Sequence, residues 1–306
     1  MNKVVLIGCG NVGMSYAYNI VTTSNAVNEL VLIDVRKEKV EGEALDLMHA
    51  SAYSNSNINI KAGSYEDCND ASIVCICAGR NQEVGETRQD LLSKNIQVFK
   101  AIIEEINKTN FNGIYLIATN PLDVMTAVTQ KLSGFPTQRV IGSGTTLDSA
   151  RLRNLLGKKF GINAKSVHAY VIGEHGDSEM IPWSNATIGL NKITNDFTDE
   201  EKIEIKNEVV RSAYDIIEKK GSTCYGIGVC LMKITNAILS DTREVMTVSS
   251  YNKEHDCYFS MPTVVGRDGT IKVCYLEMSK SEHKEISKCV KFLEEVTHKA
   301  IKSLEE

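Results

Sequence analysis

The chain has 306 residues, of which 42% are hydrophobic and 24% charged, and its formal net charge is −5. This length allows a large core and favours two lobes in one compact unit. The negative charge, without any cluster of Lys and Arg, argues against nucleic acid as a partner. No apolar run approaches the length of a membrane span, and no signal-peptide pattern precedes the first strand. The nine scattered cysteines form no C-x-x-C pair, so we expect reduced thiols in a cytoplasmic protein and no metal site.

The N-terminal segment predicts a dinucleotide site. An apolar strand over residues 3–7 leads directly into a G-x-G-x-x-G motif and then into a helix. In this motif Gly8 allows a tight turn, Gly10 lets a pyrophosphate approach the backbone, and Gly13 permits close packing of helix on strand. A second predicted strand ends in Asp34, at the spacing of an acid that binds ribose hydroxyls, which favours NAD over NADP. The alternative is an ordinary βαβ unit without a ligand.

Strands and helices alternate through the first half of the chain. Strands are predicted over 3–7, 29–33, 59–62, 72–78, 113–118 and 139–141, and helices over 14–21, 37–48, 91–107 and 124–133. This series predicts an α/β fold with a Rossmann-type, doubly wound parallel sheet. Ligands of such sheets bind beyond the carboxyl ends of the strands, where this sequence places the glycine motif, Asp34, residues 79–82 and Asn120.

The pattern changes in the second half. A helix is predicted from Thr146, a strand over 167–172, helices over 198–220 and from about 226, three strands over 245–249, 258–265 and 270–276, and a final helix. Ser279 and Glu282 form a capping box that opens this last helix, whose apolar stripe indicates core or subunit contact. We therefore expect a C-terminal α+β catalytic domain over 143–306, after a nucleotide-binding domain over 1–142.

One histidine stands out by its neighbours. His175 lies between Gly173 and Gly176 at the end of the predicted 167–172 strand, and histidine exchanges a proton near neutral pH. A surface histidine in a glycine-rich turn is the alternative on this stretch alone. Asp148 and Arg151, three residues apart, share one face of their predicted helix. An exposed ion pair of little energetic value is the alternative there.

Taken together, the motifs resemble the L-lactate/malate dehydrogenase family, and within it the L-lactate dehydrogenases of bacterial type. The resemblance spans essentially the whole chain. Its residues are Gly8-x-Gly10-x-x-Gly13, Asn81-Gln82 with Gly85-Glu86-Thr87-Arg88, Ala118-Thr119-Asn120-Pro121, Gly142-Ser143-Gly144-Thr145 with Leu147-Asp148 and Arg151, Gly173-Glu174-His175-Gly176-Asp177, and Tyr214-Asp215-Ile216-Ile217 before Gly221-Ser222-Thr223. Each motif alone is weak, but their common order is specific.

The resemblance implies a role for each catalytic residue. His175 would donate a proton to the carbonyl of a 2-oxo acid, Asp148 would hold the histidine and stabilise its charged form, and Arg88 would polarise the carbonyl from a mobile loop. Arg151 would grip the substrate carboxylate with two parallel hydrogen bonds, while Asn120 and Thr223 would line the substrate site. The implied cofactor is NAD, bound by Gly8, Gly10, Asn11, Val12, Gly13, Asp34, Ala78, Gly79, Thr119 and Asn120. The Asn120–Pro121 bond is cis in this family.

Gln82 carries the expectation for substrate choice. Malate dehydrogenases have arginine at the matching position, where it pairs with the second carboxylate of oxaloacetate. Glutamine has no charge, so a closed site would bury that carboxylate without a partner, which favours the methyl group of pyruvate. The expected activity is NAD-dependent L-lactate dehydrogenase, as in glycolytic pyruvate fermentation. Malate or another L-2-hydroxy acid is the alternative in the same family, because Arg80 replaces a small residue in this loop.

Two further residues resemble an allosteric site. Arg153 and His168 match the positions that bind fructose 1,6-bisphosphate between subunits of bacterial lactate dehydrogenases, and the family implies a homotetramer. A helix-surface charge and an interface histidine are the alternatives. An NAD-using, metal-dependent glycosidase would need a ligand cluster that the sequence lacks. A protein that keeps the fold without activity is disfavoured because His175, Asp148, Arg151 and Arg88 are all retained.

Overall fold

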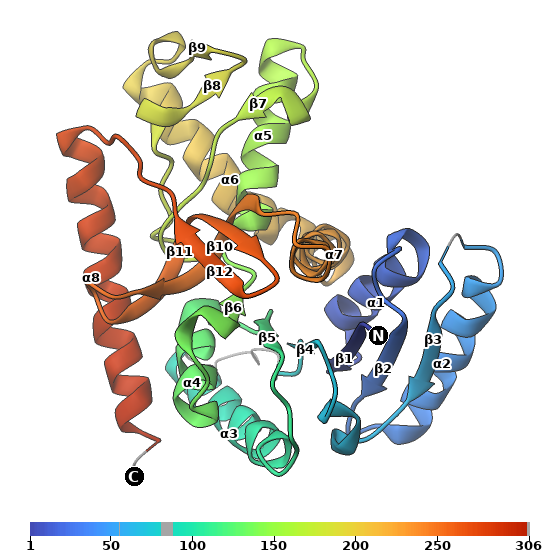
Figure 1. The fold of residues 1–306 in the computed structure, drawn as a ribbon. Coiled ribbons are helices and arrows are strands. Elements are labelled where there is room, and N and C mark those ends of the chain that lie inside the picture. The colour runs from blue at the N-terminus through green and yellow to red at the C-terminus, as the bar shows by residue number, and fades with distance from the viewer. Residues whose placement is uncertain (55, 81–87, 305–306) are drawn as a thin grey trace.

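A single mixed sheet of nine strands runs through the molecule, in the order β12-β11-β10-β6-β5-β4-β1-β2-β3 (Figure 1). The computed structural model describes residues 1–54, 56–80 and 88–304, without the side chains of 88 and 89. Within these ranges no helix combines the length and the apolar character needed to cross a membrane.

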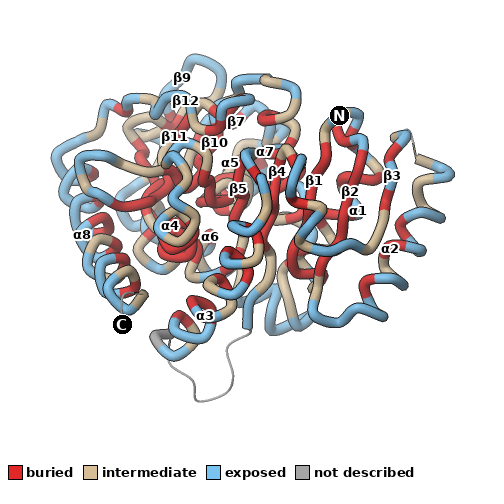
Figure 2. Tube along the Cα trace, turned by 60° about the horizontal axis from the view of Figure 1, so that its bottom comes forward, coloured by how far each residue is buried: buried red, intermediate tan, exposed pale blue. Residues whose placement is uncertain are grey.

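Six strands from the first half of the chain lie parallel in the sheet. They are β1 (Lys3–Ile7), β2 (Glu29–Ile33), β3 (Asn59–Ala62), β4 (Ile73–Ile76), β5 (Ile114–Ile117) and β6 (Val140–Gly142). The central strands are apolar throughout because helices cover both faces of the sheet. In β1, Val4 and Leu6 pack on one face, and Val5 and Ile7 pack on the other. Figure 2 shows these strands as the buried centre, with the exposed helix surfaces outside.

Helices from both halves of the chain cover the sheet. On one face lie α1 (Asn11–Thr23), α2 (Lys37–Ser51) and α7 (Tyr225–Leu239), and the Tyr16 hydroxyl of α1 shares a 2.6 Å hydrogen bond with Thr235 of α7. On the other lie α3 (Arg88–Ile106), α4 (Leu122–Ser133) and the end of α8 (Lys280–Lys302). The predicted capping box opens α8, with Ser279 accepting a bond from the amide of Glu282. The apolar stripe of α8 is buried in the core.

The C-terminal strands extend the same sheet instead of forming a separate one. The antiparallel strands are β10 (Glu244–Asn252), β11 (Cys257–Gly266) and β12 (Gly269–Val273). β10 joins β6 through the pair Ser249 and Gly142. A Cβ on Gly142 would lie 2.5 Å from Oγ1 of Thr126 and 2.8 Å from Cβ of Ser249, so this junction requires glycine.

A second, smaller layer carries part of the C-terminal half. It contains α5 (Thr146–Phe160), α6 (Asp199–Lys220) and a sheet of β7 (Val167–His168), β8 (Thr187–Ile188) and β9 (Asn191–Lys192) (Figure 1). Short 3-10 helices span Tyr65–Cys68, Thr137–Arg139, Ala164–Ser166, Trp183–Asn185 and Thr194–Asp196. The predicted long helix over 198–220 is confirmed, with Thr198 as its N-cap.

The predicted strand over 167–172 is wrong for most of its length, because only Val167 and His168 form a strand. The backbone beyond them finds its partners on side chains of α5 and of its N-cap residue, Thr145. The amide of Val171 donates to Oγ of Ser149 at 2.9 Å, the hydroxyl of Thr145 donates to the carbonyl of Val171, and Arg153 donates to the carbonyl of Ala169 at 3.1 Å. A segment satisfied in this way needs no neighbouring strand.

Candidate active site

The loop that carries His175 is fixed at its base by two backbone bridges. Ile172 pairs with Met180, and Gly173 pairs with Ser260 of β11. Gly173 has a φ of +91°, and a Cβ there would lie 2.9 Å from Sγ of Cys289 in α8. The glycine therefore lets the loop turn against α8 and present the histidine on the other side.

His175 and Asp148 form a tight pair across a long stretch of sequence. Nδ1 of His175 lies 2.6 Å from Oδ2 of Asp148, and Nη1 of Arg151 donates to Oδ1 of the same carboxylate at 2.7 Å. The Asp148 side chain is 3% exposed and that of Arg151 12%, so this is a buried cluster and not the exposed ion pair of the alternative interpretation. The His175 side chain keeps 26% of its surface exposed, which leaves its ring accessible from solvent.

The electrostatics of this pair favour a charged histidine. Burial alone would lower the pKa of His175, but the charge of Asp148 and its hydrogen bond outweigh burial and raise the pKa to about 9. Burial would raise the pKa of Asp148, but His175 and then Arg151 hold it below its usual range. The pair is therefore an imidazolium next to a carboxylate at neutral pH, ready to give a proton to a bound molecule.

Asp123 holds the backbone of His175 in place, and the sequence analysis did not identify this aspartate. Its carboxylate accepts the backbone N–H of His175 at 2.9 Å and the hydroxyl of Ser249 at 2.6 Å. The residue is 2% exposed, and burial raises its pKa to about 6. An acid in the first turn of a helix is common at exposed positions, so spacing alone gives no signal that this one holds α4, β10 and the His175 loop together.

The glycine motif forms an open turn between β1 and α1. Gly8 has a φ of +100°, and a Cβ on it would lie 2.3 Å from the amide nitrogen of Ala78. A Cβ on Gly13 would lie 2.0 Å from the carbonyl oxygen of Gly8, so strand and helix approach closely here. No atom lies within 4 Å of the Cβ position on Gly10, which leaves space for a phosphate at the helix N-terminus. This cradle fits a dinucleotide.

Asp34 closes this turn at the end of β2. Its Oδ2 accepts the N–H of Cys9 at 2.9 Å, while Oδ1 accepts both the backbone N–H and Nε of Arg36 at 3.1 and 3.2 Å. These bonds outweigh burial and lower the pKa of Asp34. The carboxylate is therefore ionised at neutral pH, as a reader of ribose hydroxyls requires, and Arg36 is held beside it.

A buried asparagine, also missed by the sequence analysis, joins two predicted site segments. Asn95 of α3 accepts the N–H of Arg80 at 2.8 Å and donates to the carbonyl of Asn120 at 2.8 Å. Asn95 is 1% exposed and lies within an apolar helix face. A single polar residue on such a face is the sequence signal that could have identified it. Thr119 donates to the carbonyl of Ala78 at 2.7 Å, so the ends of β4 and β5 meet at this point. The Asn120–Pro121 bond is cis.

The remaining predicted residues are distributed around this region. Asn11 donates to the hydroxyl of Ser222 at 3.0 Å, which brings the start of α1 to the segment that contains the half-buried Thr223. Val12 is half-buried, and Gly79 lies so close to Thr119 that a Cβ on it would be 2.6 Å from Cγ2. Gln82 and the side chain of Arg88 lie outside the described residues.

Among the described residues, the predicted allosteric residues make no recorded hydrogen bond or ion pair with His175 or Asp148. His168 is exposed, and Arg153 is half-buried on α5. Arg153 donates to the carbonyl of Ala169, next to His168, and its guanidinium lies 5.2 Å from the ring centroid of Tyr170.

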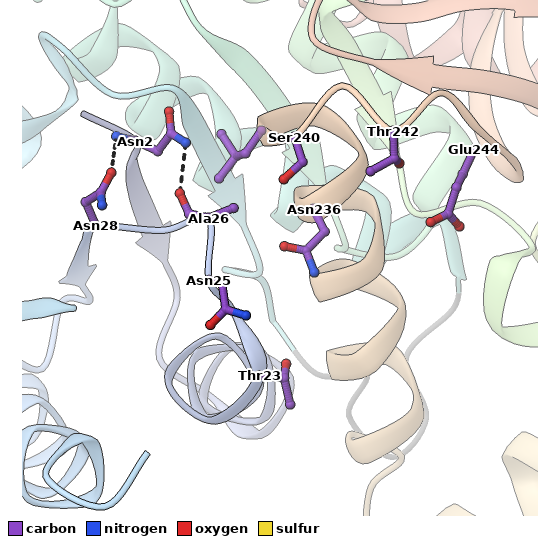
Figure 3. A pocket seen from close by; sticks show the side chains of 10 residues that line it. Asn2, Thr23, Asn25, Ala26, Asn28, Asn236, Ser240, Thr242 and Glu244 are labelled. Atoms are coloured by element: carbon purple, nitrogen blue, oxygen red, sulfur yellow. Dashed lines mark hydrogen bonds between the residues drawn. The ribbon is translucent and has the colours of Figure 1, made fainter. Parts of the chain in front are cut away.

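A pocket of about 520 Å³ lies at the opposite end of the sheet (Figure 3). Amides and hydroxyls line most of it, between the ends of α1 and α7 and the residues that precede β1 and β2. It contains none of the predicted site residues. Because ligands of doubly wound sheets bind beyond the carboxyl ends of the strands, we place the functional site at the glycine turn and the histidine instead.

A Rossmann-type sheet with this dinucleotide cradle, together with a solvent-accessible histidine hydrogen-bonded to a buried aspartate, defines an NAD-dependent oxidoreductase. Family profiles agree with this class. Residues 2–142 match the profile described as lactate/malate dehydrogenase, NAD binding domain, and residues 145–304 match the lactate/malate dehydrogenase alpha/beta C-terminal domain. The chain belongs to the lactate/malate dehydrogenase family.

Individual relatives are similar over nearly their full length. L-lactate dehydrogenase 2 of Bacillus cereus (strain ATCC 10987) is 47% identical over 305 residues, which cover 96% of this chain and 97% of the relative. L-lactate dehydrogenase of Bacillus pumilus is 45% identical, with 97% of each chain covered. A solved lactate dehydrogenase from a Medee basin deep-sea metagenome library has a TM-score of 0.94 at 41% identity, covering 98% of this chain and 99% of its own. The minor L-lactate dehydrogenase of Enterococcus mundtii has a TM-score of 0.93 at 37% identity, covering 97% and 98%.

Proposed function

We propose that this chain is an NAD-dependent L-lactate dehydrogenase, which reversibly reduces pyruvate to L-lactate. The observation that carries this proposal is the cluster in which Asp148 binds His175 at 2.6 Å and Arg151 at 2.7 Å. One carboxylate thereby holds a proton donor and a carboxylate-binding cation on the same side of the site. A 2-oxo acid needs both groups, one for its carbonyl and one for its carboxylate.

We propose His175 as the acid that protonates the substrate carbonyl during reduction and as the base for the reverse reaction. Asp148 accepts a hydrogen bond at Nδ1, which leaves Nε2 to face the substrate. A pKa raised to about 9 supports this assignment, because the proton is present on His175 at neutral pH when the substrate carbonyl arrives.

Arg151 is our candidate for binding the substrate carboxylate. Nη1 is occupied by Asp148, and among the described residues the structure records no other partner for this guanidinium. The free N–H groups can therefore form two parallel bonds to a carboxylate, a geometry that lysine does not offer. Asn120 and Thr223 are proposed to line the same site, and Arg88 to polarise the carbonyl.

The proposed NAD site uses the cradle and the carboxylate described above. Gly8, Gly10, Asn11, Val12 and Gly13 would bind the pyrophosphate, and Asp34 the ribose, with Ala78, Gly79, Thr119 and Asn120 toward the nicotinamide. When bound, the nicotinamide supplies or accepts the hydride. The role of the protein is to hold the nicotinamide ring against the substrate and to keep the proton donor beside the same carbonyl group.

Gln82 carries the proposed choice of pyruvate over oxaloacetate, because it offers no charge to a second carboxylate. Gln82→Arg should therefore move the ratio of kcat/KM values toward oxaloacetate. Gln82→Met, of similar length and without charge, is the control and should keep the preference for pyruvate. An unchanged ratio in Gln82→Arg would refute the charge argument.

The direct test of the function is oxidation of NADH with pyruvate and with oxaloacetate in parallel. We expect a large preference for pyruvate. A preference for oxaloacetate would indicate malate dehydrogenase activity, with Arg80 as the first candidate for the cation. NADH binding without turnover of either acid would support a protein that keeps the fold but not the activity.

We also propose the division of the chain into an NAD-binding domain over 1–142 and a catalytic domain over 143–306. It is supported by the end of β6 at Gly142, after which α5 and the smaller layer begin. A cytoplasmic location is proposed because all nine cysteines are free, as expected in a reducing compartment.

Regulation by fructose 1,6-bisphosphate is proposed at Arg153 and His168 in a homotetramer. His168 is exposed and immediately precedes Ala169, whose carbonyl Arg153 binds, so both can contribute to one phosphate-binding surface. Sedimentation and pyruvate KM, each with and without the bisphosphate, test this proposal. Arg153→Gln should abolish a drop in KM that the wild type shows, and the absence of any effect on the wild type would refute it.

A further inference from the structure

Glu179 is a buried acid for which the proposed mechanism has no role. It lies four residues after His175, at the end of the loop that the Ile172–Met180 bridge closes. The residue is 3% exposed. Among the described residues its carboxyl group has no hydrogen-bond partner, and only its backbone N–H is bonded, to the carbonyl of Gly176 at 3.3 Å. A buried carboxylate without such bonds is costly in free energy.

The carboxyl group of Glu179 faces the catalytic pair. One of its oxygens, one oxygen of Asp148 and one ring nitrogen of His175 all lie within 4.8 Å of one another. The charged groups that act on it come from three elements. Asp148 and Arg151 lie on α5, His175 lies on the same loop, and Lys206 lies on α6.

Among the described residues, the two cations of this cluster that Asp148 binds, Arg151 and His175, form no ion pair with Glu179. Asp148 carries one negative charge and is bonded to both Arg151 and His175. A second carboxylate would be buried beside Asp148, with which it shares no hydrogen-bond donor. Burial and the charge of Asp148 therefore raise the pKa of Glu179 to about 9, close to that of His175.

We propose that Glu179 is a positioning residue that shares the titration of the His175–Asp148 pair, carrying a proton at neutral pH and releasing it in place of His175 in alkaline solution. This inference rests on the proposed function of His175. When Glu179 gives up its proton to solvent, its new negative charge stabilises the neighbouring imidazolium. The two groups then lose protons as one coupled system and not as independent acids.

This coupling has opposite effects on the two directions of the reaction. Reduction of a 2-oxo acid requires protonated His175, so an ionised Glu179 extends reduction to higher pH. Oxidation of the hydroxy acid requires the neutral ring, so the same charge holds oxidation back. Glu179 would thus extend the pH range of pyruvate reduction and delay the alkaline rise of lactate oxidation, without changing the equilibrium of the reaction.

The first test compares the pH profiles of wild type and Glu179→Gln with pyruvate and with L-lactate. Glutamine has nearly the shape of the neutral acid, so kcat/KM at pH 7 should stay within about twofold. At pH 10 pyruvate reduction by the variant should be lower by roughly fourfold, because only His175 is left to lose the proton. Glu285→Gln, which removes an exposed carboxylate 2.7 Å from Lys206, is the control and should leave the profile unchanged. Equal alkaline limbs, or a uniform loss at every pH, would overturn the proposal.

The second test needs neither turnover nor a variant. At pH 8 the infrared spectrum of the wild-type protein should contain the carbonyl band of a protonated carboxylic acid, which disappears as the pH rises toward 10. Asp123, with a pKa of about 6, is already ionised at pH 8 and does not contribute. Absence of the band would overturn the proposal. A band that titrates in a protein inactive toward pyruvate would refute the proposed function while leaving the buried proton on Glu179 established.

Discussion

Replacing Asp148 with asparagine separates the charge of this residue from its shape. The pKa of His175 is raised from 6.5 to about 9. Burial lowers this pKa, but the charge of Asp148 and its hydrogen bond together raise it by more. At about 1.4 kcal/mol per unit, this shift corresponds to roughly 3 kcal/mol in favour of the imidazolium. Without that charge the pKa should fall to about 6.5, because burial lowers it and the remaining charge of Asp123 makes a smaller contribution than Asp148 does.

The expected loss in Asp148→Asn therefore depends on pH. At pH 8 the protonated fraction of His175 falls from about nine-tenths to about 3%, whereas at pH 5.5 it is about nine-tenths in the variant and nearly complete in the wild type. Pyruvate reduction relative to wild type should thus worsen by roughly 30-fold between pH 5.5 and pH 8. Initial rates of NADH oxidation across this range measure it, with Asp199→Asn, whose side chain is 91% exposed, as the control. A loss of the same size at every pH would refute the electrostatic account and assign Asp148 a purely geometric role.

Three further substitutions probe the rest of the site. Arg151→Lys should raise the KM for pyruvate by about 10- to 100-fold, because an ammonium cannot keep the bond to Asp148 and form a two-point contact to the substrate; a near-normal KM would contradict this. Asp34→Ser should free Arg36 for a 2′-phosphate and improve kcat/KM with NADPH relative to NADH by about tenfold or more, and no gain would mean that Asp34 does not read the ribose. Asp123→Ala should lower the free energy of unfolding by at least about 2 kcal/mol in urea titrations, since it leaves the buried N–H of His175 and the hydroxyl of Ser249 without an acceptor. Asp123→Asn retains an acceptor and should cost less.

The dinucleotide half of the fold was largely predictable because its signals are local. Buried parallel strands are short apolar runs, and the glycine motif encodes its own turn, which is why the predicted strands over 3–7, 29–33 and 59–62 agree with β1, β2 and β3. The strand predicted over 167–172 failed because its backbone bonds to side chains of α5 and of its N-cap residue, and periodicity contains no information about such partners.

The candidate site was predictable only in part. The spacing of Asp148 and Arg151 places them on one helix face, but the spacing does not reveal that this face is buried against His175. That contact was expected from the family resemblance and not from the local pattern. Asp123, Asn95 and Glu179 gave no recognised motif, because their roles depend on the amide or charge that the fold brings beside them.

The continuous sheet has a consequence for building hybrids of this enzyme with its relatives. The first 142 residues alone would leave β6 as an open edge, where β10 now pairs at Gly142, and would leave α1 without the cover of α7. A cut after residue 142 therefore severs one shared core instead of separating two units that fold alone. An exchange of cofactor preference between relatives should move α7 together with the nucleotide-binding segment, so that Tyr16 keeps its partner Thr235 and the transplanted surface stays covered.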